Sequence, residues 1–295
     1  MRRLGFLAAV LPFAVLLATP LAQGRAPATV NDGYGDFMYV PAGTFRMGDN
    51  FGDGMPRERP VHIVDLDAFY IGKLEMSNGE WKRFREDPGY DDPRFWPDGH
   101  VVPKNQVPYW NQANNHGGGT PDSDSYPLLG VNWDSATAYA KWLSEKTGKT
   151  YRLPTEAEWE KAARGTDQRR YPWGSEIDRS YANYVGSQAY DTGRPVGFFD
   201  GSLRGTFQTK NNASPYGALD MAGNVMEWCL DWYDRDYYSR SPRKNPKGPE
   251  TGAYRVVRGG TFFVEAFDQR TYARSAAWPS FQGHRMIGFR LVREP

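Results

Sequence analysis

Cysteine is almost absent from this sequence of 295 residues, in which Cys229 is the only one. A single thiol cannot form an intramolecular disulfide, so packing or a metal must stabilise the fold. Because Cys229 lies between Trp228 and Leu230, we interpret it as a small buried side chain rather than a reactive thiol.

An excess of charge of either sign is also absent, since 36 Lys and Arg residues face 35 Asp and Glu residues. Nucleic-acid partners are therefore not expected. Histidine is scarce as well. The four histidines show no spacing that would place two of them on one helix face, and zinc and non-haem iron prefer clustered imidazoles. Transition-metal sites of this kind are not expected.

Long apolar runs are confined to the N-terminus. Two arginines follow Met1, residues 4–17 are apolar, and small residues come next. This pattern predicts a secretory signal peptide over residues 1–24, and hence an exported, periplasmic or extracellular protein. The run is shorter than the roughly 20 residues of a membrane span, so no stable span is expected after signal cleavage. Residues 25–35 read as a short linker, and residues 36–295 as one domain.

Aromatic residues, glycine and proline are abundant, with 10 Trp, 18 Tyr, 16 Phe, 32 Gly and 22 Pro. Buried aromatic rings can form the core, while the glycines and prolines indicate many turns and short elements. Alternating apolar residues predict strands at 37–40, 44–48, 61–66 and 69–72.

Three helices are predicted from their capping residues. Ser77 with Glu80, and Thr155 with Glu158, have the spacing of capping boxes. Asp134 is the expected cap of a helix that ends at Gly148. The predicted class is therefore α+β.

Several motifs occur in a fixed order along the chain. They are Tyr39–Gly48, Val131–Trp133, Arg152–Glu160, Tyr171–Gly174, Ala182–Tyr184, Tyr216–Trp228, Arg258–Phe262 and Gly288–Arg290. Together they resemble the formylglycine-generating, or sulfatase-modifying-factor, family over nearly all of residues 36–293. The resemblance implies a single, irregular domain related to C-type lectins.

The resemblance also implies structural calcium, a cation that prefers oxygen ligands. Its expected ligands are the Glu227 carboxylate and the carbonyls of Ala222, Gly223 and Val225. A second calcium site is expected at Asn183 and Tyr184, with Asp191 as a further ligand. The alternative for the first site is a turn with a surface glutamate.

Two cysteines that the resemblance places in the catalytic site are missing. In the formylglycine-generating enzyme such a pair binds copper(I) and exchanges thiols with the substrate. The matching positions here are Val264 and Gln269. Valine has no ligand atom and glutamine offers only a hard oxygen, whereas copper(I) requires soft ligands. Copper-dependent formylglycine formation is therefore not expected.

A substrate groove is nevertheless expected, together with two interpretations of the arginines near it. The candidate groove residues are Trp228, Thr261, Phe263, Val264, Gln269 and Arg274. Arginines of the C-terminal segment either tie irregular backbone carbonyls together or, in one case, face the groove and hold an anionic group.

Two functions remain open from the sequence. The first is a pseudoenzyme or binding module that holds a peptide, a peptide-like ligand or a glycan. The alternative is a non-copper oxidoreductase-type maturation factor for a peptide-derived substrate such as a siderophore precursor, as the resemblance suggests for exported members without the cysteine pair. Glu265 and Asp268 are the nearby general-base candidates, unless they are solvated loop carboxylates.

Overall fold

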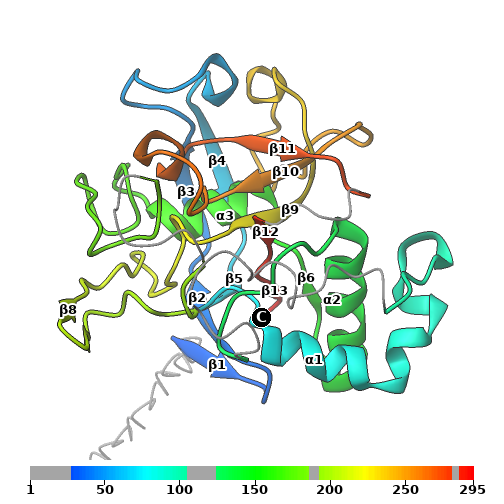
Figure 1. Cartoon of the computed structure of the whole chain (residues 1–295). Helices are drawn as coiled ribbons and strands as arrows, with labels where there is room; N and C mark the ends of the chain where they lie inside the picture. The colour runs from blue at the N-terminus through cyan, green and yellow to red at the C-terminus, as the bar shows by residue number, and fades with distance from the viewer. Residues whose placement is uncertain (1–27, 105–123, 186–192, 281–285) are drawn as a thin grey trace, which may run out of the picture.

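The computed structural model describes residues 28–104, 124–185, 193–280 and 286–295. The predicted signal peptide lies outside these residues. Within them, no helix is both long and apolar enough to cross a lipid bilayer. Three α-helices, short strands and many turns make up the described chain (Figure 1), which confirms the predicted α+β, turn-rich class.

A five-stranded sheet has the strand order β1-β2-β5-β13-β6. The C-terminal strand β13 pairs antiparallel with both β5 and β6, so the end of the chain joins strands that are far apart in the sequence. β1 lies inside the expected linker, yet it pairs with β2. The strands are β1 Thr29–Asn31, β2 Asp36–Val40, β5 Phe69–Gly72, β6 Tyr151–Arg152 and β13 Val292–Arg293.

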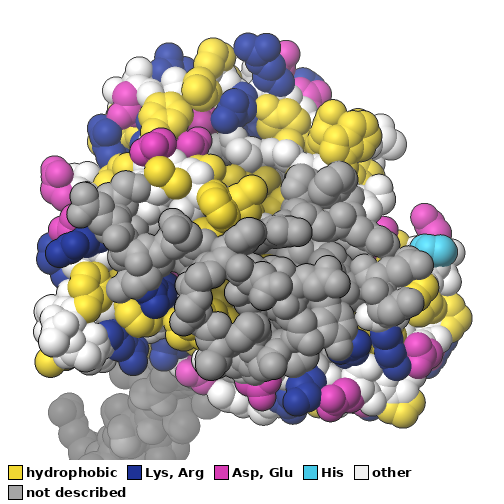
Figure 2. Space-filling model, viewed as in Figure 1, with side chains coloured by type: hydrophobic (Ala, Val, Ile, Leu, Met, Phe, Trp, Pro, Cys, Tyr) yellow, Lys and Arg dark blue, Asp and Glu magenta, His cyan; other side chains and the backbone are white. Residues whose placement is uncertain are grey.

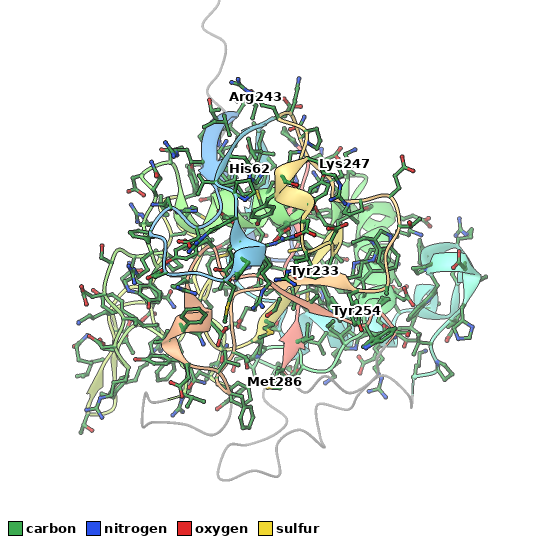
Figure 3. All side chains as sticks on the ribbon, turned by 90° about the horizontal axis from the view of Figure 1, so that it is seen from above. His62, Tyr233, Arg243, Lys247, Tyr254 and Met286 are labelled. Carbon is green, nitrogen blue, oxygen red and sulfur yellow. The ribbon has the colours of Figure 1, made fainter. Side chains whose placement is uncertain are left out.

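A four-stranded sheet has the order β11-β10-β9-β12, in which β12 is parallel to β9 and the other pairs are antiparallel. Tyr233 and Tyr254 meet at one end of this sheet, and Met286 lies at the other (Figure 3). The strands are β9 Met226–Trp232, β10 Arg255–Arg258, β11 Ser275–Ala277 and β12 Ile287–Gly288.

The remaining short elements are two hairpins and several 3-10 turns. The hairpins pair β3 Gly43–Met47 with β4 His62–Leu66, and β7 Leu203–Arg204 with β8 Phe207–Gln208. The 3-10 turns are η1 Pro56–Glu58, η2 Pro88–Asp91, η3 Pro93–Phe95, η4 Pro97–Gly99, η5 Tyr237–Ser239 and η6 Ala266–Gln269.

The helices are α1 Asn78–Glu86, α2 Trp133–Thr147 and α3 Glu156–Arg164. Both predicted capping boxes are present at α1 and α3. The cap of α2 differs from the prediction, because Asn132 rather than Asp134 accepts the hydrogen bond, which comes from the Ser135 N–H. An asparagine side chain accepts this bond as well as an aspartate does, so the helix begins two residues earlier.

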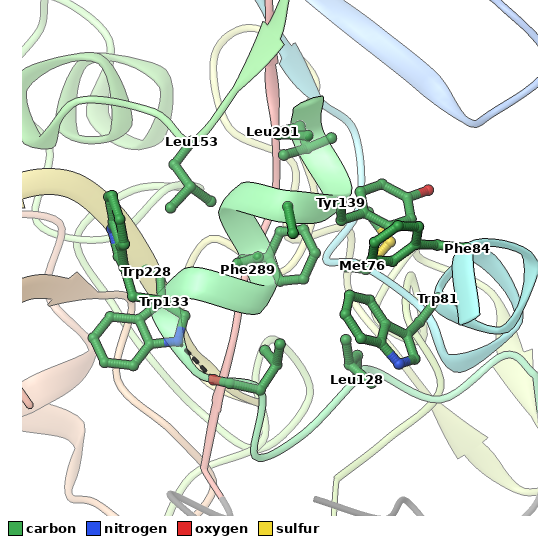
Figure 4. Close-up of a cluster of buried hydrophobic side chains, with 14 of the residues drawn as sticks. Met76, Trp81, Phe84, Leu128, Trp133, Tyr139, Leu153, Trp228, Phe289 and Leu291 are labelled. Atoms are coloured by element: carbon green, nitrogen blue, oxygen red, sulfur yellow. Dashed lines mark hydrogen bonds between the residues drawn. The ribbon is translucent and has the colours of Figure 1, made fainter. Parts of the chain in front are cut away.

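Two buried clusters form the core. The first packs aromatic rings of α1 and α2 against the C-terminal segment, including Trp81, Tyr139 and Phe289 (Figure 4). Trp228 belongs to this cluster, and its Nε1 donates to the Val131 carbonyl at 2.8 Å. The second cluster surrounds α3, whose nine residues are all buried.

Charged residues on one face of α3 are buried. Glu156, Glu160 and Arg164 recur every four residues, so they lie above one another along the helix. The Arg164 Nη1 donates to Glu160 Oε1 at 2.8 Å and to the Gly48 carbonyl at 2.7 Å. The Gly48 N–H donates to the same Glu160 oxygen at 2.8 Å. This face therefore ties α3 to the end of β3.

Two further arginines complete this network. Arg258 donates to Glu156 at 2.9 Å, to Glu160 at 2.6 Å and to the Thr271 carbonyl at 2.8 Å. Arg274 binds both oxygens of Glu156, at 2.6 and 2.8 Å. Burial raises the pKa of the Glu156 carboxyl, but the opposing effect of Arg274 and Arg258 prevails, and the pKa lies below its ordinary value. Glu156 is therefore ionised in the fold.

Replacing Arg258 by methionine tests this network. Arg258→Met leaves Glu156 and Glu160 without their shared partner, and removal of one member of a buried pair costs about 3–5 kcal/mol. We expect the free energy of unfolding in urea to fall by this amount. In the control, Arg94→Met removes an exposed ion pair with Asp92, and the unfolding midpoint should not move. Equal effects of the two substitutions would contradict a structural role for the network.

The pH dependence of stability tests a second buried group. Burial, followed by repulsion from Glu156, raises the pKa of Asp231 from 3.8 to about 8. The folded state then holds a proton that the unfolded chain releases above about pH 4, so the stability that this group contributes is lost as the pH rises towards 8. We expect Asp231→Asn to reduce the loss of unfolding free energy between pH 5 and 8. Asp67→Asn, at a carboxylate whose side chain is 72% exposed, should leave the loss unchanged.

Candidate functional site

The segment that follows β10 carries Val264 and Gln269, the two positions that the resemblance matched to the catalytic cysteines. It starts at Gly259 and Gly260, which have φ values of +97° and +70°. A Cβ atom on Gly260 would collide with the Gln269 amide and the Asp268 carbonyl. Only glycine fits here, because the backbone is left-handed and the space is filled. The chain at Gly260 therefore follows a path that any side chain would block.

Gln269 closes this segment into a tight turn. Its side chain has no exposed surface, and its Nε2 donates to the Thr261 carbonyl at 2.9 Å and to the Val264 carbonyl at 3.2 Å. The Val264 carbonyl also accepts from the Val185 N–H at 3.0 Å. We name residues 261–269 the closed turn. Position 269 is thus occupied by an amide that bridges two backbone carbonyls, and position 264 by the alkyl side chain of valine.

The predicted groove residues do not all reach the surface. Trp228, Thr261 and Gln269 are 0% exposed and Arg274 is 1% exposed. In this arrangement they cannot touch a ligand. Phe263, at 51% exposed, and the half-buried Val264 remain accessible on the closed turn, and the groove itself stays a prediction.

The C-terminal arginines act on the backbone instead. Arg274 donates to the Arg57 carbonyl at 2.7 Å in addition to binding Glu156. Arg270 donates to the carbonyls of Phe267 and Asp53, at 2.6 and 3.0 Å. These contacts support the interpretation in which the C-terminal arginines tie irregular backbone carbonyls together.

The outer face of the closed turn is aromatic and acidic. Phe263 is 51% exposed and Phe267 is 37% exposed. Glu265 is exposed and Asp268 is partly exposed. In Figure 2, hydrophobic and acidic side chains lie close together in the area where Figure 1 shows this turn. Burial raises the pKa of Tyr184, and the negative charges of Asp178 and Glu265 raise it further. The next residue, Val185, donates its N–H to the Val264 carbonyl at 3.0 Å, so Tyr184 borders the turn.

The carboxylate expected at the first calcium site is engaged in a buried ion pair. Glu227 is 0% exposed. It accepts from Arg290 Nε and Nη2, both at 2.6 Å, and from Trp159 Nε1 at 2.7 Å. Calcium at Glu227 would compete with these donors. The residues described contain no cluster of three or more His, Cys, Asp or Glu side chains suited to a metal. Calcium at Ala222, Gly223, Val225 and Glu227 stays a prediction.

The second calcium site falls beside the first. The Asn183 carbonyl accepts from the Asn224 N–H at 3.0 Å, so the segments of Asn183 and Gly223 are in contact. Tyr184 follows directly, whereas Asp191 lies outside the described residues. The structure thus brings together two motifs that are about 40 residues apart in the sequence, and calcium at this second site also stays a prediction.

Asn224 and Glu75 are important residues that the sequence reasoning missed. Asn224 Nδ2 donates to Glu75 Oε2 at 2.6 Å, and the Asn224 carbonyl accepts from the Phe262 N–H at 3.1 Å. Burial raises the pKa of Glu75 well above its ordinary value. An asparagine directly after Gly223 was the available sequence signal, since asparagine is one of the few residues that adopt the left-handed conformation found here, with φ +64°.

Comparison with known proteins identifies the family of this chain. The sulfatase-modifying factor enzyme 1-like domain matches residues 23–295. The chain is 36% identical to a formylglycine-generating enzyme of Thermomonospora curvata, over 92% of this chain and 96% of that protein. It is 32% identical to hercynine oxygenase of Mycolicibacterium smegmatis, over 83% of this chain and 57% of that protein. The chain belongs to the sulfatase-modifying factor enzyme 1-like family.

Solved structures show the same fold. The structure of PvdO from Pseudomonas aeruginosa has a TM-score of 0.70 and 26% identity, covering 92% of this chain and all of that one. Treponema denticola variable protein 1 has a TM-score of 0.68 and 24% identity, covering 90% and 98% of the two chains. The predicted C-type-lectin-like fold of this family is confirmed.

The reactivity of Cys229 can be predicted from its environment. The side chain is 0% exposed, and burial raises the pKa of its thiol well above the ordinary value. We expect an aromatic disulfide reagent to modify Cys229 at least about 10³-fold more slowly in the folded protein than in urea, since folded domains outnumber unfolded ones by about 10³ or more. Fast modification of the folded protein would show that the thiol is accessible, contrary to its burial on β9.

Proposed function

We propose that this protein is an exported binding module of the sulfatase-modifying factor family. It holds a peptide or peptide-like ligand on the outer face of the closed turn, and it does not perform the copper-dependent thiol chemistry of the formylglycine-generating enzymes. The observation that carries this proposal is the filling of both former cysteine positions, by the alkyl side chain of Val264 and the fully buried amide of Gln269.

The exposed aromatic rings support a binding role. A soluble domain gains little from leaving Phe263 and Phe267 exposed at 51% and 37%, and exposed aromatic residues are enriched where partners bind. Both rings lie on a turn that backbone and side-chain hydrogen bonds hold in place. A rigid surface loses little conformational freedom when a ligand binds.

Substitutions on the turn test the binding role. An array of defined pentapeptides probes the purified mature protein, and the best binders are measured by fluorescence anisotropy. We expect Phe263→Ala with Phe267→Ala to weaken binding at least about tenfold, because aromatic anchors contribute 1 kcal/mol or more each. The control Leu203→Ala removes a side chain that is 63% exposed on the β7–β8 hairpin, and it should bind as the native protein does.

Two results would contradict this proposal. One is binding that survives the loss of both phenylalanines. The other is conversion of a sulfatase-derived cysteine peptide to its aldehyde by the native protein with copper and air, measured by mass spectrometry.

The alternative function is a non-copper oxidoreductase-type maturation factor for a peptide-derived substrate such as a siderophore precursor. The accessible carboxylates of Glu265 and Asp268 favour it, because they can serve as general bases beside a bound ligand. Oxygen uptake or a mass change of a bound peptide-derived substrate, lost in Glu265→Gln, would establish this function. Unchanged ligand mass and no oxygen uptake would exclude it for that substrate.

A further inference from the structure

The outer face of the closed turn carries negative charge that no described cation neutralises. Glu265 and Asp268 form no salt bridge with the described residues, unlike Asp53, which binds both Arg170 and Arg270.

The aromatic part of the same face also attracts cations. The Phe263 ring packs against Phe262 with centroids 4.6 Å apart, which leaves about half of its side chain exposed. The Phe267 ring is already covered on one side by the Arg270 guanidinium, at 3.5 Å. Phe263 is therefore the ring with a free face, and a π face binds an ammonium or guanidinium group.

We propose that the ligand of the closed turn carries a positively charged side chain, as in a peptide containing lysine, ornithine or arginine. This inference rests on the proposed binding function and names the chemistry of its ligand. The cationic head lies against Glu265 and Asp268, and its alkyl stem crosses Phe263.

Three features of the geometry favour this occupant over a neutral or anionic one. The charge of the face is complementary to a cation, while an anionic peptide would meet two carboxylates at short range. The alkyl stem of lysine or ornithine covers apolar surface while its head stays near water. Tyr184 is a third aromatic residue beside the turn, since the N–H of the next residue, Val185, donates to the Val264 carbonyl at 3.0 Å.

A set of pentapeptides with one variable central residue tests the inference. The set contains lysine, norleucine, which has a similar length without the charge, and glutamate. Anisotropy titrations with the mature protein should show the lysine peptide binding about fivefold tighter than the norleucine peptide at 50 mM salt, the order expected for exposed ion pairs. The preference should shrink at 500 mM salt, because salt screens exposed charges.

Matched variants identify the groups responsible. Glu265→Gln with Asp268→Asn should abolish the preference for lysine while the norleucine peptide still binds. Glu250→Gln removes an exposed carboxylate between β9 and β10 and should keep the preference. Equal binding of the lysine and norleucine peptides by the native protein, or an unchanged preference in the double variant, would overturn this inference alone. Failure of every peptide to bind would instead overturn the proposed function on which it rests.

Discussion

The rest of the structure depends on the buried ion-pair network of α3. Glu156 and Glu160 accept from Arg258, which ends β10, and Glu156 also accepts from Arg274, which precedes β11. These two arginines lie on either side of the closed turn. The turn is therefore held at both ends by contacts that are independent of the side chains at positions 264 and 269. Such a buried network is costly to break, because each lost partner leaves an unpaired charge in the core.

This arrangement explains how one fold can keep its shape while its chemistry changes. The family similarity spans residues 23–295, and the groups that position the turn are buried arginines, glutamates and glycines. The groups of the proposed ligand surface are few and lie on the outside of the turn. Replacement of two side chains can remove thiol chemistry without disturbing α3 or either large sheet. The residues that maintain the fold therefore differ from those that would carry the thiol chemistry.

Local features of this protein were predictable from the sequence, whereas long-range partners were not. The capping boxes at Ser77 and Thr155 require only neighbouring residues, and both helices begin where they indicated. The partners of Glu156 and Glu227 lie more than 60 residues away, and no local pattern encodes such pairing. The order of the motifs predicted the fold. It did not predict the burial of Trp228 and Arg274, because their burial also depends on residues that are distant in the sequence. A strand of three residues such as β1, within the expected linker, is too short to show the alternation that predicts a strand.

The most direct measurement is copper(I) binding by a variant that restores two thiols, Val264→Cys with Gln269→Cys, in competition with a chromogenic copper(I) chelator under anaerobic conditions. If the contacts of Arg258 and Arg274 keep the turn in place when the Gln269 hydrogen bonds are lost, the double variant should take one copper(I) per chain from a chelator concentration at which the native protein and Gln269→Cys take none. Equal copper(I) binding by the native protein, or no gain in a folded double variant, would contradict this view.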